Sequence, residues 1–395
     1  MNIYADNAAT TKLSPRAKDA MMPYFDELFG NPSTLHTPGQ LAKQALESAR
    51  ERIAAALGAA PAEIYFTSGG SEADVQAITS AAKFGERKGK KHIISTAFEH
   101  HAVLHTLENL EKQGFEVTLL PVHEDGVVCL EDLEEALRPD TALVTVMFAN
   151  NEIGTLQPIR EIGALCREKG VLFHTDAVQA VGHVPVDVKE MNIDMLSVSG
   201  HKFHGPKGVG VLYAKRGIPL VNIIFGGAQE RGKRPGTENI PGIVGMAEAL
   251  QENIEHMDEN MEKISALRDR LISGLSEIPH SRLNGSRDKR VPGTVNMCFE
   301  GVEGESLLLM LDDKGIAASS GSACTSGSLD PSHVLLALGL PHEVAHGSLR
   351  LSICEENTME QMDYIVESVK EVVEYLRNMS PVWQDLENGK RTHLL

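Results

Sequence analysis

Short apolar segments alternate with amphipathic ones from about residue 15 to residue 255, and this alternation limits the possible folds more than any other feature. The strand-like runs are Glu63–Thr67, His92–Ser95, Glu116–Pro121, Ala142–Phe148, Gly170–Thr175, Met195–Ser199 and Gly208–Tyr213. Most of them are separated by helix-like segments, at Glu72–Gly85, His101–Gln113, Leu130–Leu137 and Ile159–Lys169. Buried strands that alternate with helices predict an α/β fold with a mostly parallel sheet and helices on both faces.

The length of the chain, 395 residues, predicts two domains, because a single hydrophobic core usually stops growing below this size. We expect a large domain at 15–255 and a smaller α+β domain made of 1–14 and 256–395. One or two long helices in Gly242–Leu275 would bridge them. Further helices are expected at Arg16–Phe29, Gln40–Leu57 and Thr358–Met379, and strands near Thr294–Phe299 and Leu349–Ser352.

Charge and cysteine content exclude several classes of protein. The formal net charge of −18 argues against nucleic acid as a partner, because no basic surplus is available to neutralise phosphates. The N-terminus shows no secretory pattern, and no window approaches about 18 uninterrupted apolar residues, so no membrane segment is predicted. The five cysteines are scattered without a CxxC pair, which argues against a disulfide framework or a zinc site and favours a reducing cytoplasm.

Residues that directly follow a strand are the first candidates for a site, because ligands of open α/β sheets bind beyond the carboxyl ends of the strands. The stretch Ser68–Ser71 (SGGS) lies between a predicted strand and a predicted helix. Its glycines allow backbone N–H groups to approach an anion, and the helix dipole favours phosphate. A simple helix cap explains the stretch equally well. The stretch matches neither GK[ST] nor GxGxxG, so it is not a nucleotide loop of either type.

Three further strand ends carry reactive side chains. Asp176 could pair with a protonated pyridine nitrogen, although a helix N-cap is the commoner role of an isolated Asp. Lys202 directly follows a strand and could form a Schiff base with an aldehyde cofactor, with Lys207 as the competing lysine. In Glu99-His100-His101 an imidazole could stack on a flat ring and shuttle protons. Together with the anion cradle, these positions favour a pocket for pyridoxal phosphate over four separate structural explanations.

The chain also resembles a known family in motifs that run in order from Tyr4 to about Trp383. They are YADNAATT, FTSGGSEAD, EHHAV, NNEIG, TDAVQ, SGHKFHGPKG, GGAQERG, SSGSACTSGSLDPSHVL and GSLR. This set is similar to the cysteine desulfurases of the NifS/IscS type, which are class-V-aminotransferase-like enzymes. The resemblance implies the aspartate-aminotransferase-like fold, pyridoxal 5′-phosphate, a homodimer and conversion of L-cysteine to L-alanine. It also implies sulfur delivery to iron–sulfur cluster assembly, through a scaffold of the NifU/IscU type, or to another acceptor.

The resemblance implies a role for each matching residue. Lys202 would hold the cofactor and then carry the substrate proton, Asp176 would bind the pyridine nitrogen, and Arg350 would clamp the substrate carboxylate. The other contacts to cofactor or substrate would come from Gly70, Ser71, His100, Asn151, Gln179, Ser199 and His201. Thr237 would reach the phosphate of the other subunit.

Cys324 would carry the sulfur as a persulfide. It is flanked by Ser and Gly within Ser319–Ser328, which by itself indicates an exposed and mobile loop. The resemblance implies that its thiolate attacks the substrate sulfur, and that it can also ligate a cluster shared transiently with a scaffold protein. The remaining cysteines are expected to be structural, with Cys166 and Cys298 on apolar faces and Cys129 and Cys354 assigned there by preference.

The sequence departs from the family pattern at three places. Ser71 stands where threonine is common, Pro235 where serine is usual, and Cys354-Glu355 where Gly-Arg is frequent. The last change reverses the charge a few residues after Arg350, at the rim of the expected pocket. Two rival functions stay open: a lyase on the same fold, such as a selenocysteine lyase, and a non-catalytic sulfur carrier that retains the pocket.

Overall fold

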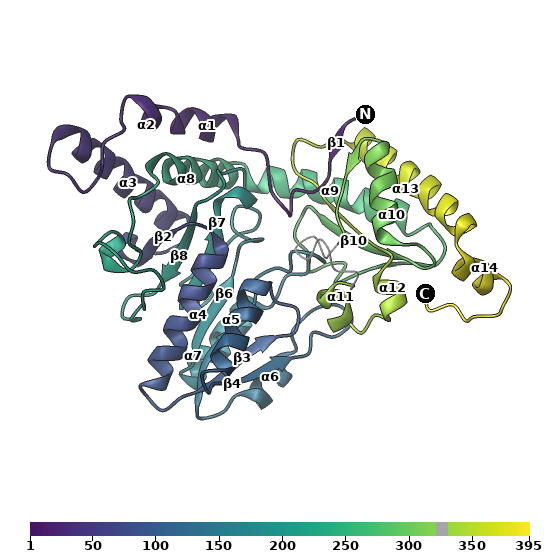
Figure 1. Cartoon of the computed structure of the whole chain (residues 1–395), viewed down its shortest axis with the longest axis horizontal. Helices are drawn as coiled ribbons and strands as arrows, with labels where there is room; N and C mark the ends of the chain where they lie inside the picture. The colour runs from purple at the N-terminus through teal and green to yellow at the C-terminus, as the bar shows by residue number, and fades with distance from the viewer. Residues whose placement is uncertain (321–330) are drawn as a thin grey trace.

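The computed structural model describes residues 1–320 and 331–395, so Cys324 lies outside the described residues. Figure 1 shows two groups of elements, a larger one around a central sheet and a smaller one that contains both ends of the chain. Among the described residues, the helices all fall short of the length and apolar content that crossing a membrane requires.

A seven-stranded sheet forms the centre of the larger group, in the order β2-β8-β7-β6-β5-β3-β4. Its strands are β2 (Ile64–Thr67), β3 (His92–Thr96), β4 (Glu116–Leu120), β5 (Thr141–Thr145), β6 (Leu172–Asp176), β7 (Met195–Ser199) and β8 (Gly210–Ala214). β8 is antiparallel to both of its neighbours, and the pairs from β7 across to β4 are parallel. The predicted α/β fold with a mostly parallel sheet is therefore confirmed.

Helices cover both faces of this sheet. They are α1 (Pro15–Met21), α2 (Pro23–Asp26), α3 (Thr37–Ala56), α4 (Gly70–Glu86), α5 (His101–Glu111), α6 (Leu130–Ala136), α7 (Ile159–Lys169) and α8 (Ile240–Glu255), with short 3-10 turns η1 (Pro61–Glu63), η2 (Gly200–Lys202) and η3 (Glu230–Gly232). Neighbouring residues of one strand face opposite cores: Ile93 packs with residues of α4 and α5, and Ile94 with residues of α3, α7 and α8. Since both faces are covered, strands β3, β5, β7 and β8 are buried along their whole length instead of alternating between buried and exposed residues.

The prediction of one helix over Arg16–Phe29 was wrong. α1 ends at Met21, and α2 spans only Pro23–Asp26. Pro23 has no backbone N–H to continue the hydrogen-bond ladder of α1, so the first helix cannot run through it. Ser14 caps α1 by accepting a hydrogen bond from the Ala17 N–H at 2.9 Å.

The smaller group is built on two small sheets. β1 (Ile3–Tyr4) pairs in parallel with β11 (Ile316–Ala317), and β10 (Thr294–Phe299) lies antiparallel between β9 (Ser281–Leu283) and β12 (Ser348–Ser352). The helices are α9 (Met257–Leu275), α10 (Gly304–Asp313), α11 (His333–Ala337), α12 (His342–Ala345), α13 (Met359–Met379) and α14 (Pro381–Glu387). β1, α9, β10, α10, β12 and α13 share a separate core. Apolar residues of α11 and α12 pack into the core of the larger group instead.

The long helical stretch predicted between the two groups is divided at His256 into α8 and α9. α8 packs on α1 and α3, and α9 packs on α13 and β10, so the two helices connect the two cores (Figure 1). The division of the chain into 15–255 and the remainder stays a prediction.

A buried ion pair fixes the loop that leads to Thr237. Arg50 on α3 and Glu230 are both almost fully buried, and Arg50 Nη2 lies 2.6 Å from Glu230 Oε1. Glu230 Oε2 accepts hydrogen bonds from Arg50 Nη1 and from the backbone N–H of Phe66, both at 2.8 Å. Glu230 has a φ of +45°, a conformation that non-glycine residues rarely adopt, so the ion pair holds a strained turn in place.

We predict that Glu230→Ala destabilises the chain by about 3–5 kcal/mol, because it leaves the Arg50 guanidinium buried without its carboxylate. The shift of the urea unfolding midpoint measures the effect. Glu47→Ala is the matched control: Glu47 also contacts Arg50, at 3.3 Å, but its side chain is 49% exposed. That change should cost less than about 1 kcal/mol. Equal effects of the two substitutions would contradict the prediction.

Candidate active site

Ten of the predicted site residues line one cavity of about 340 Å³. They are Gly70, Ser71, His100, Asn151, Asp176, Gln179, Ser199, His201, Lys202 and Arg350. Most follow the carboxyl ends of central strands, as expected for an open α/β sheet. Thr237 is exposed and is absent from this lining. A volume of this size is typical of a small-molecule site.

The SGGS stretch, which predicted either an anion cradle or a helix cap, lies at the start of α4. A second hollow of about 370 Å³ adjoins the cavity, and its lining includes Gly69, Ser71, Ser199 and His201. A Cβ on Gly70 would lie 2.6 Å from Val178 Cγ2, so only glycine fits at the first residue of the helix. The hollow therefore combines backbone N–H groups at a helix start with two hydroxyl groups, a combination that suits phosphate.

Lys202 lies in the cavity and is held by a segment that the sequence argument overlooked. Its Nζ donates hydrogen bonds to the backbone oxygens of Ala8 at 2.6 Å and Ala9 at 2.9 Å. Gln179 Nε2 donates to the same Ala8 oxygen at 2.9 Å. The competing Lys207 is exposed and lines the adjoining hollow, and it is not part of the lining of the main cavity. Ala8 and Ala9 belong to the N-terminal motif YADNAATT, which was the sequence feature that could have placed this segment beside Lys202.

Two buried carboxylates lie at the bottom of the cavity. Asp176 ends β6, and its Oδ1 accepts a hydrogen bond from the Val178 N–H at 2.9 Å, so it both caps a turn and lines the cavity. Asp74 on α4 is 1% exposed, and its Oδ1 has no hydrogen-bond partner among the described residues. Burial raises the pKa of both groups, and the charge of Asp176 raises that of Asp74 further. The pair therefore favours a cationic ligand group.

Sequence reasoning missed Asp74, although it lies one helical turn after Gly70 and therefore on the same face of α4. His100 was found, and the structure adds how it is oriented. It is the N-cap of α5, and its Nδ1 accepts a hydrogen bond from the Ala102 N–H at 3.1 Å. This contact leaves Nε2 as the nitrogen directed away from the helix end.

Arg350 reaches the cavity from β12 in the smaller group. Its Nη1 donates to the Asn151 backbone oxygen at 3.1 Å, and its Nη2 lies 2.8 Å from Asp6 Oδ1. Nε has no hydrogen-bond partner among the described residues. The guanidinium is thus paired with a carboxylate of the chain itself, at the position where the sequence predicted a substrate carboxylate.

Comparison with known proteins decides the family. The class-V aminotransferase family matches residues 3–365. The cysteine desulfurase IscS of Clostridium botulinum strain Hall is 56% identical over 98% of both chains. The IscS cysteine desulfurase of Methanosarcina thermophila is 54% identical over 96% of this chain and 94% of its own. The chain belongs to the cysteine desulfurases of the class-V aminotransferase family. A solved NifS-like protein shares the fold, with a TM-score of 0.89 and 38% identity over 95% of this chain and all of the other.

Cysteine desulfurases of this family are pyridoxal-phosphate enzymes that take sulfur from cysteine. This chain is therefore a pyridoxal-phosphate-dependent cysteine desulfurase. The cavity fits that cofactor. The cradle at the start of α4 suits the phosphate, the buried Asp176 and Asp74 suit a protonated ring nitrogen, and the Lys202 amine suits the aldehyde. The two cysteines expected on apolar faces, Cys166 and Cys298, are fully buried, and burial raises the pKa of their thiols to about 12 and about 11.

Glu99 makes the folding stability of the chain depend on pH. Its Oε1 accepts hydrogen bonds from Thr96 Oγ1 at 2.8 Å and the Met147 N–H at 2.9 Å, and burial raises its pKa from 4.5 to about 8. A raised carboxyl pKa means that the folded chain holds a proton that the unfolded chain has lost. The free energy that this protonated carboxyl contributes to folding is therefore fully present below pH 4.5 and is lost as the pH rises through about 8.

We predict that the melting temperature of Glu99→Gln falls less than that of the unmodified enzyme between about pH 5 and pH 9, because the amide cannot ionise. Differential scanning fluorimetry across this range measures the effect. Glu108→Gln is the control, since Glu108 is exposed on α5, and its pH profile should run parallel to that of the unmodified enzyme. A parallel profile for Glu99→Gln as well would contradict the prediction.

Proposed function

We propose that the enzyme moves the sulfur of L-cysteine onto Cys324 as a persulfide and releases L-alanine, with Lys202 as the cofactor-binding lysine. The observation that carries the proposal is that Lys202 shares one cavity with Asp176, His100 and the start of α4. Bound pyridoxal phosphate supplies an electron sink for negative charge at the substrate α-carbon. Every other part of the reaction then falls to side chains of the protein.

The residues of the cavity divide this work by their chemistry. The Lys202 amine binds the cofactor and afterwards moves the α-proton of the substrate. Asp176, as a buried carboxylate, keeps a ring nitrogen protonated, and His100 covers the ring. The phosphate contacts are Gly70, Ser71, Ser199 and His201, and the contacts to the ring oxygen are Asn151 and Gln179.

Arg350 is proposed to bind the substrate carboxylate. Its planar guanidinium can hold a carboxylate through two parallel hydrogen bonds. Its pairing with Asp6 supports the proposal, because it demonstrates that a carboxylate fits against Nη2 in this position. The substrate carboxylate would exchange with Asp6 or approach the Nε edge, which has no hydrogen-bond partner among the described residues.

The described residues on both sides of Cys324 support its proposed role. Before it, the Ser319 N–H donates to the Arg350 oxygen at 3.2 Å, and the Arg350 N–H donates to the Ser319 oxygen at 2.6 Å. After it, Ser332 Oγ contacts Glu152, and His333 Nε2 lies 2.9 Å from the Glu99 oxygen. Both ends of the segment are thus attached near the cavity. Five residues from Ser319 can span up to about 17 Å, enough for the thiolate to attack the substrate sulfur.

Attack by the Cys324 thiolate forms an S–S bond and breaks the C–S bond of the substrate. The carbon fragment gains a proton and leaves as L-alanine. The same sulfur must then reach an acceptor outside the cavity, which requires the cysteine to move between the two positions. These steps distinguish the proposal from a lyase, which would not need the cysteine.

The proposal extends to partners and location. The acceptor is an iron–sulfur scaffold of the NifU/IscU type, and Cys324 can ligate a cluster that is shared with it. A homodimer is proposed, in which Thr237 meets the phosphate in the partner's cavity; its exposed position on a loop held by the Arg50–Glu230 pair supports this. The cytoplasm is the proposed location, supported by free thiols at Cys129, Cys166, Cys298 and Cys354.

We predict that incubation with L-cysteine adds about one sulfur to the peptide that contains Cys324 and to no other peptide, as measured by mass spectrometry without reductant. Cys324→Ala should keep the visible absorbance of the bound cofactor and lose persulfide and alanine production. Cys129→Ala is the matched control and should behave as the unmodified enzyme, because Cys129 bonds to exposed Glu131 outside the cavity. Full alanine production by Cys324→Ala would instead identify a lyase, and a chain that cannot bind the cofactor would identify a carrier.

Arg350→Lys should lower kcat/KM for L-cysteine by about tenfold to a hundredfold, because a lysine cannot replace the two parallel hydrogen bonds. The effect should lie mainly in KM, with cofactor absorbance unchanged, and steady-state alanine production measures it. Arg282→Lys is the control: Arg282 lies on the same small sheet, on β9, outside the cavity lining. An unchanged KM for Arg350→Lys would refute the carboxylate role.

A further inference from the structure

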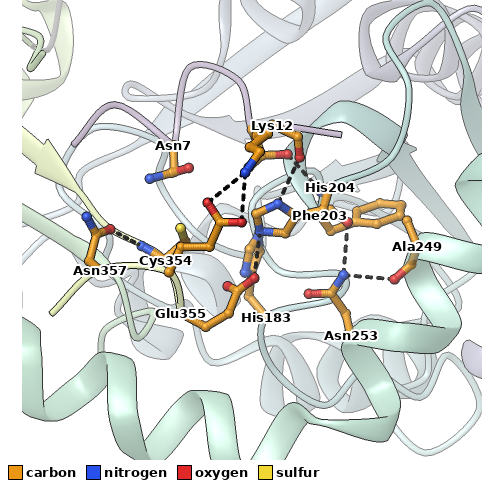
Figure 2. A network of polar contacts seen from close by, with 12 residues as sticks. Asn7, Lys12, His183, Phe203, His204, Ala249, Asn253, Cys354, Glu355 and Asn357 are labelled. Atoms are coloured by element: carbon orange, nitrogen blue, oxygen red, sulfur yellow. Dashed lines mark hydrogen bonds and ion pairs between the residues drawn. The ribbon is translucent and has the colours of Figure 1, made fainter. Parts of the chain in front are cut away.

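A second group of reactive side chains lies outside the cavity and has no part in the proposed reaction. It consists of His204, Cys354 and Glu355, and Figure 2 shows the Glu355 carboxylate directed at His204, with Cys354 next to them. His204 follows η2, and Cys354-Glu355 follows β12. This is the place where the sequence departs from Gly-Arg of the family pattern. The group therefore lies at a departure from that pattern and calls for its own explanation.

The spacing of the three side chains suits a tetrahedral metal ion. His204 Nε2 lies 3.4 Å from Glu355 Oε1. Two ligand atoms at about 2.0–2.1 Å from Zn²⁺ in tetrahedral geometry are about 3.4 Å apart, so this pair is already at the required separation. All three ligand atoms, including Cys354 Sγ, lie within 4.8 Å of one another. A thiolate ligand needs about 3.6 Å, which a shift of about 1 Å in the Cys354 side chain supplies.

His204 is oriented as a metal-binding histidine usually is. Its Nδ1 lies 3.0 Å from the Lys12 backbone oxygen, which fixes the proton on Nδ1 and leaves the Nε2 lone pair directed at the cluster. The His204 N–H donates to Thr11 Oγ1 at 2.8 Å. The residue also has a φ of +65°, a conformation that costs energy in a non-glycine residue. The backbone is therefore held in a strained form that presents the imidazole to Glu355.

The surroundings leave room for the ion and a fourth ligand. A cavity of about 40 Å³ is lined by the three residues and by His183 and Asn253, and a volume of this size holds an ion with one water molecule. His204 and Cys354 are buried, and Glu355 is partly exposed, so the cluster has a path to solvent. Lys12, whose backbone oxygen holds His204, pairs its own ammonium with Glu356 at 3.1 Å.

We propose that His204, Cys354 and Glu355 bind a Zn²⁺ ion, with water in the fourth position. Imidazole, thiolate and carboxylate are the ligands that zinc takes in proteins, and calcium and magnesium do not use the first two. The absence of a CxxC pair argued against zinc at the level of sequence. That argument fails here because the three ligands come from two segments about 150 residues apart in the chain.

The ion would fasten the segment that carries Lys202. His204 is two residues after Lys202, and His183 Nε2 lies 2.8 Å from the Lys202 backbone oxygen. From the other side, Asn253 Nδ2 on α8 donates to the Phe203 oxygen at 2.9 Å (Figure 2). Binding at His204 would therefore join this segment to the end of β12, which also carries Arg350. The role is structural, and it does not depend on the proposed sulfur transfer.

The simplest competing explanation is an ion pair between His204 and Glu355 with no metal. That pair explains the 3.4 Å contact, but it assigns no role to Cys354. Measurement of zinc binding separates the two explanations. The test uses the full chain with its cofactor in a Cys324→Ser background, so that the sulfur-carrying thiol cannot bind the metal.

After treatment with a chelator and desalting, the protein is titrated with ZnCl₂ against a competing indicator dye, and its metal content is measured by plasma mass spectrometry. We expect about one Zn²⁺ per chain. Cys354→Ser and Glu355→Gln should each weaken binding by at least about tenfold, since even the loss of an indirect partner has an effect of this size. Both substitutions are close in shape to the original residues, and circular dichroism verifies that each variant is folded.

Two controls address the other groups of potential ligands among the described residues, which are His123, Cys129 and Asp132, and His280, Glu300 and His393. Cys129→Ser and His393→Gln should leave the zinc affinity unchanged. Co²⁺ gives a second measurement that does not depend on the variants folding equally well. In the parent protein it should show tetrahedral absorption in the red, away from the cofactor band, together with a thiolate charge-transfer band.

The proposal is overturned if the chelated protein takes up no Zn²⁺, which leaves the ion pair as the explanation. It is also overturned if Cys354→Ser binds Zn²⁺ as tightly as the parent, or if Cys129→Ser is the variant that loses it. A Co²⁺ complex without thiolate absorption would likewise exclude Cys354 as a ligand. Each of these outcomes leaves the persulfide assignment to Cys324 intact, so failure here does not affect the proposed function.

Discussion

Burial of two carboxylates below one cavity is the constraint on which the active site depends. Asp176 and Asp74 are both removed from water, and burial of an anion without a partner costs several kcal/mol. Within the described residues, Asp74 Oδ1 has no hydrogen-bond partner, and His174 Nε2 lies 3.7 Å from it. A cationic ring nitrogen would relieve this cost, so cofactor binding should stabilise the fold as well as enable the chemistry. The surrounding sheet must in turn be rigid enough to keep the two groups buried.

The N-terminal segment is what joins the two groups of elements at the cavity. Backbone oxygens of Ala8 and Ala9 hold the Lys202 amine, and Ser352 Oγ on β12 accepts a hydrogen bond from the Ala8 N–H at 2.8 Å. Further along the same segment, the Lys12 oxygen holds His204. Lysine, carboxylate and arginine thus come from different elements, and a short extended segment sets their separation. This explains why motifs spread over nearly the whole chain are needed to build one site.

The sequence predicted those parts that depend on local pattern and strand order. Apolar runs located the seven strands to within a few residues, and strand ends located Asp176 and Lys202, since the carboxyl ends of parallel strands meet at one edge. It missed Asp74, because a buried carboxylate inside a helix has the same local signature as a solvated one. It joined α1 and α2 because amphipathic periodicity continues past Pro23, and only the missing N–H breaks the ladder.

The departures from the family pattern could be seen in the sequence but not interpreted there. Cys354-Glu355 reads as a charge reversal near Arg350, yet β12 carries Arg350 to the cavity while Glu355 pairs with His204 on the other side of the Lys202 segment. The new carboxylate therefore faces His204 and lies outside the lining of the cavity that holds Arg350. Since Lys202 and His204 are two residues apart, anything that changes the His204–Glu355 contact must act on the same short turn as the cofactor. A substitution at His204 or Glu355 would therefore act on the turn that carries the lysine without altering any residue of the cavity lining.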